Sequence, residues 1–244
     1  MTNQRPLAVV PAFNESATVG HVVTELTAVG LSVLVVDDGS RDGTSLVAED
    51  AGATVLSLPL NLGVGGALRA AFRFAVEHGY SSVVQVDGDG QHPVHQIPDL
   101  ERAAVDHGAH LVIGSRYISS DSTLTQSVGR RMAMGFLGRL VTRAVGRQIT
   151  DSTSGFRLIR EPLLSQFAAE FPSYYLGDTY EATIAAARAG YKVIEIPAAL
   201  RPRSMGVSSA TSARAITLIA KVLVVTILRL HPRIRKIDAA SRDH

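Results

Sequence analysis

The first half of the chain alternates short β-branched or aliphatic runs with longer segments in which apolar residues recur every three or four positions. The short runs predict buried strands and the longer segments predict helices. The predicted strands cover residues 6–12, 32–36, 53–58, 83–86, 111–114 and 191–196. The predicted helices cover residues 16–29, 43–50, 65–78, 93–106, 129–146 and 178–189, with Ser16 as the expected N-cap of the first. This alternation indicates right-handed βαβ units, so we predict the α/β class with a mostly parallel sheet flanked by helices.

Acidic residues follow directly after several of the predicted strands. Glu15, Asp38, Asp87 and Asp89 all occupy such positions. Ligands of an open parallel sheet bind outside the carboxyl ends of its strands. We therefore expect these acids, which are far apart in the sequence, to share one crevice. The alternative is that they are independent loop acids on a solvated edge.

The segment Asp87-Gly88-Asp89-Gly90-Gln91-His92 is the strongest candidate for chemistry. Alternate residues of an extended segment point the same way, so Asp87 and Asp89 can aim at one point. Hard carboxylate ligands suit Mg²⁺ or Mn²⁺, which keep open positions for water and substrate phosphates. The alternative is that these Asp-Gly pairs only form turns. Of the two nearby histidines, we expect His92 to lie near the site and His95 to begin a helix.

Composition narrows the class of protein. The chain has 244 residues, 46% of them apolar, which predicts a real core and argues against disorder. A net charge of +2 gives no reason to expect a nucleic-acid partner, and the absence of cysteine excludes disulfides and thiolate chemistry. The start shows no signal-peptide pattern, so a cytoplasmic protein is expected. We predict one catalytic domain over residues 1–210 and an extension over residues 211–244.

A glycine-rich segment, residues 61–66, precedes a predicted helix as phosphate-binding loops do. It lacks the G-x-G-x-x-G spacing and the acid expected about 20 residues later, so a dinucleotide-binding fold is not expected. The absence of a P-loop lysine motif and of G-x-S-x-G lowers the odds of an NTPase or a serine hydrolase.

Arginines are the second candidate group. Arg116 follows a predicted strand, Arg131 lies at the start of a predicted helix, and Arg203 follows the last predicted strand. Guanidinium groups bind phosphate in a bidentate way, so a metal ion beside several arginines suits a diphosphate substrate. The alternative for any single arginine is a surface charge.

The extension carries an apolar segment, residues 215–230, which is shorter than the roughly 20 residues needed to span a bilayer. Arg214, Thr217 and Lys221 form a polar stripe at helical spacing, and basic residues follow up to residue 236. This pattern predicts an amphipathic helix at a membrane interface. The alternative is a helix packed on its own domain or on a second subunit of a homo-oligomer.

Seven motifs occur in the order seen in family 2 glycosyltransferases. They are residues 10–15 (VPAFNE), 36–40 (VDDGS), 42–44 (DGT), 87–92 (DGDGQH), 114–117 (GSRY), 151–157 (DSTSGFR) and 190–197 (GYKVIEIP). The chain resembles most the branch that holds dolichol-phosphate mannose synthases and bacterial polyprenyl-phosphate glycosyltransferases. The resemblance covers roughly residues 6–210.

The resemblance implies a GT-A fold and transfer of a sugar, with inversion, from a nucleotide diphosphate sugar. It implies that the nucleoside is held by Pro11, Phe13, Glu15, Val36 and Asp38. It assigns the metal to Asp87, Asp89 and Gln91, and the diphosphate to these residues and the backbone of Gly88. It places phosphates at Arg116, Arg131 and Arg203, and the acceptor beside Asp151 and Ser154.

The expected acceptor is a polyprenyl phosphate at the cytoplasmic face of a membrane. A phosphate is already a nucleophile near pH 7 and needs no strong base. The runner-up is a hydroxyl acceptor, which would need Glu181 or Asp178 as general base, although both acids also suit a structural role near a helix N-terminus. A third hypothesis is a non-catalytic sugar-nucleotide-binding subunit.

Two departures from the family pattern concern the substrates. Phe13 replaces a tyrosine that close relatives often carry, and Ser209 replaces the lysine of the pattern R-x-x-G-x-S-K. Many relatives also carry a C-terminal membrane domain, and none is expected from residues 211–244. We therefore expect a peripheral membrane contact, or a separate membrane subunit, through residues 211–236.

Overall fold

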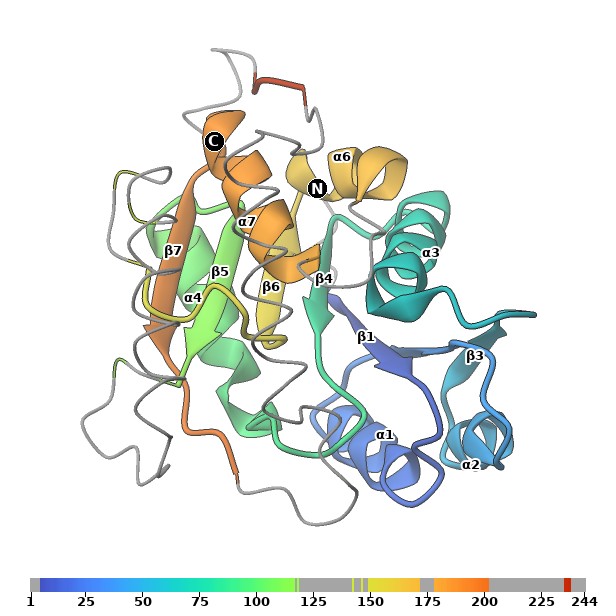
Figure 1. Ribbon diagram of the computed structural model, residues 1–244. Coiled ribbons are helices and arrows are strands. Elements are labelled where there is room, and N and C mark those ends of the chain that lie inside the picture. Colours follow the sequence, from blue (N-terminus) through green and yellow to red (C-terminus); the bar gives the residue numbers. More distant parts are fainter. Residues whose placement is uncertain are drawn as a thin grey trace, which may run out of the picture.

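The computed structural model describes residues 5–116, 118, 142, 146, 149–171, 178–201 and 235–237 (Figure 1). The strands are β1 (Leu7–Ala12), β2 (Val33–Asp37), β3 (Thr54–Ser57), β4 (Ser82–Gln85), β5 (Leu111–Ser115), β6 (Arg157–Arg160) and β7 (Val193–Pro197). The helices are α1 (Val19–Ala28), α2 (Thr44–Asp50), α3 (Gly63–Glu77), the 3₁₀ turn η1 (Val94–Gln96), α4 (Ile97–Asp106), α6 (Leu163–Glu170) and α7 (Asp178–Arg188).

The strands form one sheet in the order β3-β2-β1-β4-β6-β5-β7. β6 pairs antiparallel with both β4 and β5, while the other neighbouring pairs are parallel. The prediction of a mostly parallel sheet is therefore confirmed. β6 was not predicted, because the four residues Arg-Leu-Ile-Arg carry charges at both ends and offer too short an apolar run to recognise.

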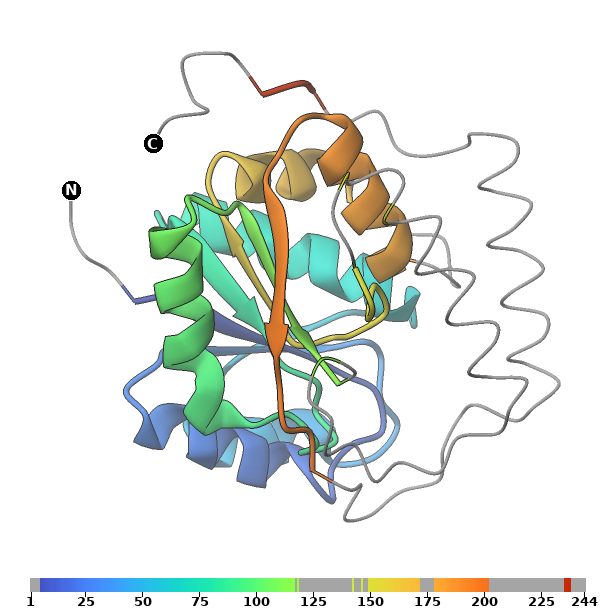
Figure 2. The same ribbon diagram turned by 90° about the vertical axis from the view of Figure 1, so that its left-hand side faces the viewer.

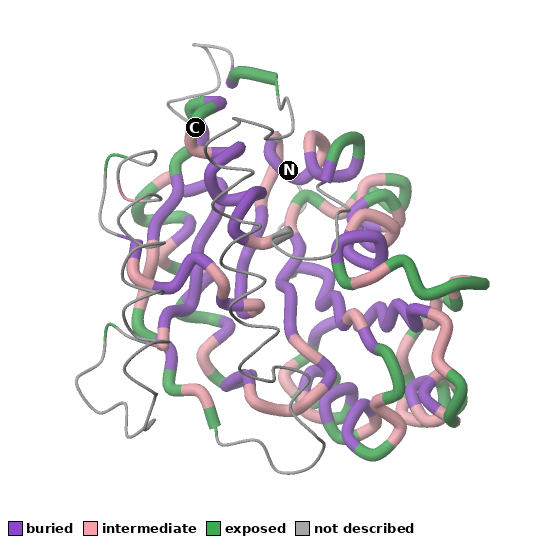
Figure 3. The backbone as a smooth tube through the Cα atoms, viewed as in Figure 1, coloured by how far each residue is buried: buried purple, intermediate pink, exposed green. Residues whose placement is uncertain are grey.

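Two apolar layers hold helices on opposite faces of the sheet (Figure 2). Alternate residues of β1 enter opposite layers: Leu7 and Val9 pack with α3, α6 and α7, and Ala8 and Val10 pack with α1, α2 and α4. This is the period of two expected for a strand buried on both faces. The central strands are accordingly buried along their length (Figure 3).

Most predicted element boundaries agree with the structure within about two residues, the usual uncertainty at element ends. Two details were wrong. The first helix begins at Val19 after Thr18, so Ser16 is not its N-cap. Helix α6 was not predicted. The predicted helix over residues 129–146, apart from residues 142 and 146, and the predicted C-terminal helix over residues 215–230 lie outside the described residues. Within the described part, no helix is both long and apolar enough to cross a membrane.

Candidate active site

Most of the candidate residues that the structure describes lie at one edge of the sheet. β1, β2, β4, β5 and β7 run in one direction, so their carboxyl ends meet there. β6 runs the other way, so it begins at this edge, and the preceding segment, residues 149–156, lies there too. Glu15, Asp38 and Asp87 follow strands that end at this edge, as predicted from the sequence.

The loop after β1 is tied to the loop after β2 by four hydrogen bonds from backbone N–H groups. The Asn14 N–H donates to Ser40 Oγ at 2.8 Å, and the Glu15 N–H donates to Thr44 Oγ1 at 3.0 Å. The other two join Arg41 to the Asn14 side chain and Ser16 to Asp42. Asn14 itself has φ 55°, a left-handed conformation that asparagine tolerates. This arrangement presents the Phe13 side chain with 46% of its surface exposed.

Asp38 has a role that the sequence did not reveal. Its Oδ1 accepts the Leu62 N–H at 2.7 Å and its Oδ2 accepts the Gly63 N–H at 2.8 Å, so the carboxylate caps the N-terminus of α3. Burial raises the pKa of Asp38, and the two backbone hydrogen bonds oppose that rise. The Leu62 and Gly63 N–H groups of the glycine-rich segment therefore bind the carboxylate of Asp38 in this structure.

The other residues predicted to hold the nucleoside lie close by with different exposures. Glu15 is half-buried and its Oε2 accepts the Thr18 hydroxyl at 3.0 Å. Pro11 is also half-buried, at the end of β1. Val36 is fully buried in the apolar layer and lies between β1 and β3 in the sheet, so the structure exposes no part of it to a ligand.

The loop after β4 approaches both neighbouring loops. A Cβ atom on Gly88 would lie 3.6 Å from the Pro11 carbonyl and 3.7 Å from Glu15 Cβ, so the predicted diphosphate and nucleoside segments are in contact. A Cβ atom on Gly155 would lie 2.5 Å from both carboxylate oxygens of Asp87. The Asp87 carboxylate thus rests directly on the backbone of the segment that precedes β6.

His92 holds Asp87 from a second side. Its buried ring accepts the Asp87 N–H at Nδ1, 2.9 Å away, and its Nε2 lies 3.5 Å from Asp87 Oδ2. Because Nδ1 is an acceptor, the neutral ring carries its proton on Nε2, toward the carboxylate. His92 therefore lies beside Asp87, as expected, whereas His95 is exposed in η1.

Asp87, Asp89 and Gln91 fit a hard divalent cation by donor type, since they offer two carboxylates and an amide oxygen. The Asp87 side chain is 41% exposed although its carboxylate is oriented by His92 and Gly155. Asp89 Oδ1 accepts the Gln91 N–H at 3.1 Å. Among the described residues, no group of three or more His, Cys, Asp or Glu side chains forms a complete metal site.

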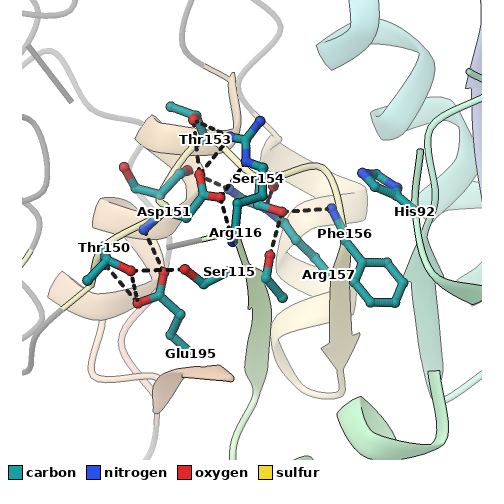
Figure 4. Close-up of polar contacts among 12 residues, drawn as sticks. His92, Ser115, Arg116, Thr150, Asp151, Thr153, Ser154, Phe156, Arg157 and Glu195 are labelled. Carbon is teal, nitrogen blue, oxygen red and sulfur yellow. Dashed lines mark hydrogen bonds and ion pairs between the residues drawn. The ribbon is translucent and has the colours of Figure 1, made fainter. Parts of the chain in front are cut away.

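Arg116 and Asp151 form a bidentate ion pair (Figure 4). Arg116 Nε donates to Asp151 Oδ2 at 2.7 Å and Nη2 donates to Oδ1 at 2.8 Å, while the Arg116 backbone N–H donates to Oδ2 at 3.2 Å. Arg116 Nη2 also donates a hydrogen bond to Thr153 Oγ1 at 3.3 Å. The structure therefore joins the predicted phosphate-binding arginine to the predicted acceptor-side acid.

Glu195 and Arg157 anchor the segment that carries Asp151, and sequence reasoning assigned neither of them a role. Glu195 accepts the Thr150 N–H at 2.7 Å, its hydroxyl at 2.9 Å and the Asp151 N–H at 2.6 Å. Burial raises the pKa of Glu195, opposed by these hydrogen bonds. The only signal in the sequence was their presence in two of the seven motifs.

Arg157 is buried at the start of β6, where 3% of its surface is exposed. It donates to the Ser152, Ser154 and Thr179 carbonyls and to the Thr183 hydroxyl. Burial lowers the pKa of the Arg157 guanidinium to about 10, opposed by the charges of Asp151, Asp87 and Glu195. It therefore stays protonated at neutral pH.

The structure places the remaining predicted residues as follows. Ser154 is buried, donates its hydroxyl to the Gly114 carbonyl and accepts the Phe156 N–H, so it faces the protein interior rather than an acceptor. Glu181 is 6% exposed on α7, and Asp178 is the first residue of that helix. Arg131 and Arg203 lie outside the described residues, as does Ser209.

Comparison with known proteins agrees with the fold and the motifs. The glycosyl transferase family 2 model matches residues 7–167. An undecaprenyl-phosphate mannosyltransferase of Micrococcus luteus is 35% identical over 215 residues, which is 84% of this chain and 86% of that protein. A polyprenol monophosphomannose synthase of Mycolicibacterium smegmatis is 31% identical over 84% of this chain and 80% of that protein.

The solved structures are similar in fold. Glucosyl-3-phosphoglycerate synthase from Mycobacterium tuberculosis, in complex with Mn²⁺, uridine diphosphate and phosphoglyceric acid, superimposes with a TM-score of 0.68 at 22% identity. The match covers 96% of this chain and 80% of that one. Sheet order, motifs and the family match agree: this chain belongs to glycosyl transferase family 2 and is a glycosyltransferase with a GT-A fold.

Proposed function

We propose that this enzyme transfers a sugar, with inversion, from a nucleotide diphosphate sugar to a polyprenyl phosphate, with Mg²⁺ or Mn²⁺ as cofactor. The observation that carries the proposal is the match over 84% of the chain to an undecaprenyl-phosphate mannosyltransferase. The polyprenol monophosphomannose synthase named above supports the same acceptor class. The Mn²⁺ and uridine diphosphate bound to a protein of the same fold support the cofactor and the donor class.

Each part of the sheet edge has a task in this reaction. Phe13, Glu15 and Asp38 hold the nucleoside beside β1 and β2. Asp87, Asp89 and Gln91 hold the divalent ion, which when bound neutralises the charge that develops on the leaving diphosphate. Arg116, oriented by Asp151, adds a fixed positive charge for phosphate. A phosphate acceptor, with a second pKa of about 6, attacks without a strong protein base.

A hydroxyl acceptor is the second candidate. The position of α7 supports it, because this helix carries both candidate bases. Arg157 ties Thr179, in the first turn of α7, to the segment that carries Asp151, so Glu181 lies on a helix attached to the site. A hydroxyl acceptor would need Glu181 or Asp178 as base. Glu181→Gln then abolishes transfer while donor binding remains. Under the favoured proposal, transfer to a phosphate persists in this variant.

The decisive experiment is a donor panel. The purified protein is incubated with Mn²⁺, a short polyprenyl phosphate and several GDP-, UDP- and dTDP-sugars, and the glycolipid is detected by mass. We expect product from one donor. Asp89→Ala should lower kcat/KM about 100-fold or more, whereas Asp99→Ala, at an exposed position on α4, should leave it unchanged. Metal-dependent donor binding without any glycolipid would contradict the polyprenyl phosphate acceptor.

We further propose that the enzyme works as a peripheral protein at the cytoplasmic face of a membrane, through residues 211–236 or a separate membrane subunit. The support is the pattern of apolar and basic residues in that segment and the lipid-linked acceptors named for the two relatives. Flotation with liposomes that contain anionic lipid tests this proposal. Binding should be lost when residues 211–244 are deleted, and binding that survives the deletion would contradict it.

A further inference from the structure

The segment from Asp151 to Gly155 contacts two residues with proposed roles in the reaction. Asp151 holds Arg116 by two side-chain hydrogen bonds. At the other end, the Gly155 backbone lies against both carboxylate oxygens of Asp87. The conformation of this segment therefore controls the position of a phosphate-binding cation and of a metal-binding anion together.

Arg157 is what holds the second half of this segment. Its Nε donates to the Ser154 carbonyl at 2.5 Å and its Nη2 donates to the Ser152 carbonyl at 2.5 Å. Its Nη1 donates to the Thr179 carbonyl at 2.8 Å and to Thr183 Oγ1 at 3.0 Å, both on α7. A planar guanidinium with donors in fixed directions can bind the segment and the helix at once, which a lysine ammonium cannot do.

We propose that Arg157 is a positioning residue for glycosyl transfer, which fixes residues 151–155 so that Arg116 and Asp87 are held in their binding orientations. The proposal rests on the roles given to Arg116 and Asp87 in the proposed function. Arg157 is 3% exposed and its donors face protein carbonyls, so it acts through the segment and does not touch a substrate.

The contact between Gly155 and Asp87 provides a second test of whether residues 151–155 position the metal-binding carboxylate. A Cβ atom there would lie 2.5 Å from Asp87 Oδ1 and Oδ2 and 2.8 Å from Cγ, closer than real Cβ atoms approach other atoms. Gly155→Ala therefore displaces the Asp87 carboxylate while Arg157 and all of its hydrogen bonds remain. A loss of metal affinity in this variant links the segment to the metal site directly.

The test measures Mn²⁺ binding by electron paramagnetic resonance, with the full chain and with GDP and UDP added in turn. Loss of a group that orients a ligand typically weakens metal binding or activity about 10- to 100-fold, and we expect that range for Arg157→Gln and for Gly155→Ala. Arg157→Lys should recover only part of the affinity. The matched control is Arg160→Gln, at the far end of β6, where the guanidinium donates to the Ala104 carbonyl; it should bind Mn²⁺ as the wild type does.

Circular dichroism identifies variants that fold, and if Arg157→Gln does not fold, Arg157→Lys decides the role of Arg157, while Gly155→Ala tests only the link between the segment and Asp87. Folded variants that bind Mn²⁺ as tightly as the wild type and keep its kcat and KM for the donor would overturn the proposal. So would a wild-type protein that binds no Mn²⁺ with either nucleotide. If Mn²⁺ binding falls as expected but the wild type glycosylates no polyprenyl phosphate, the acceptor is wrong and the positioning role stands.

Discussion

At the scale of single residues, Asp38 is a motif residue with a structural task in addition to its proposed ligand contact. Both of its oxygens accept N–H groups from the start of α3, in a site that leaves only 3% of the residue exposed. A carboxylate has further lone pairs, so this cap is compatible with the nucleoside contact proposed for it. The structure therefore gives this motif residue a structural reason that is independent of its proposed role in binding.

Asp38→Asn tests the structural demand. Asparagine keeps one acceptor oxygen but turns an NH₂ group toward a backbone N–H, so one helix-terminal donor loses its partner. We expect the free energy of unfolding to fall by about 1–2 kcal/mol, measured by urea denaturation at neutral pH. Asp99→Asn, in the exposed first turn of α4, should change it by less than about 0.5 kcal/mol. Equal effects of the two substitutions would contradict the capping role.

His110 makes stability depend on pH. Burial lowers the pKa of His110 from its usual 6.5, and the charges of Arg160 and Lys192 act in the same direction. The Lys192 N–H donates to Nδ1 at 3.1 Å, and the Tyr191 ring packs edge-on. Below pH 6.5 the unfolded chain binds a proton that the folded protein does not. The stability that the neutral His110 contributes should therefore be fully present above pH 6.5 and be lost as the pH falls through the lowered pKa.

Urea denaturation from pH 5 to pH 8 measures this dependence. The slope from this one group cannot exceed about 1.4 kcal/mol per pH unit. We expect His110→Gln to remove part of the slope below pH 6.5, so the difference between variant and wild type should change with pH only in that range. A difference that is the same at every pH would show that His110 does not titrate as described.

At the scale of elements, the packing of α3 against α6 supports the sheet beneath the site. The Phe72 ring is fully buried, 5.9 Å from the Phe167 ring and 5.1 Å from the Phe171 ring, measured between centroids. The N-terminus of the same helix is capped by Asp38. The helix thus connects an aromatic cluster in the core to the loop at the edge of the sheet.

Phe72→Ala should lower the free energy of unfolding by about 3–5 kcal/mol, because it removes a fully buried ring and leaves a cavity. Phe74, two positions away on α3, is half-buried and stacks on His78, so Phe74→Ala should cost only about 1 kcal/mol. Thermal and urea unfolding of the two variants would measure the difference. Similar losses would mean that the aromatic cluster is not a main support of this layer.

The packing between elements also explains one glycine of the motifs, Gly114. A Cβ atom on Gly114, in β5, would lie 2.4 Å from the buried Phe156 ring. The motifs around residues 114 and 156 are therefore sterically matched across the β5–β6 pair. This relation was not visible in the sequence, because the two positions are far apart along the chain and each motif alone suggested only a role in binding.

At the scale of the whole molecule, the proposed donor site spans loops from several strands, so ligands should stabilise the entire fold. We expect Mn²⁺ with the cognate nucleoside diphosphate, at 100 times its dissociation constant, to add about 2.7 kcal/mol of stability. For a chain of this size that corresponds to a rise in Tm of about 5–10 °C. Differential scanning fluorimetry with GDP and UDP measures it. A shift that persists in EDTA or in Asp87→Ala would contradict a metal-dependent site.

The sequence by itself determined much about this protein. Apolar periodicity predicted the α/β class, most elements and the mostly parallel sheet, because strand and helix periods are local properties. It also predicted that Glu15, Asp38 and Asp87 follow strands ending at one edge, because parallel strands share that edge. The motif order identified the family, which the comparison confirmed.

Only the tertiary structure decided which side chains meet. It placed the short antiparallel β6 between β4 and β5, and so brought Gly155 against Asp87 and buried Arg157 against the Ser152 and Ser154 carbonyls. It paired Arg116 with Asp151 and turned Ser154 inward. The physical reason is that such contacts join residues tens of positions apart, and their geometry depends on strand order and loop path, which hydrophobic period and local propensity do not encode.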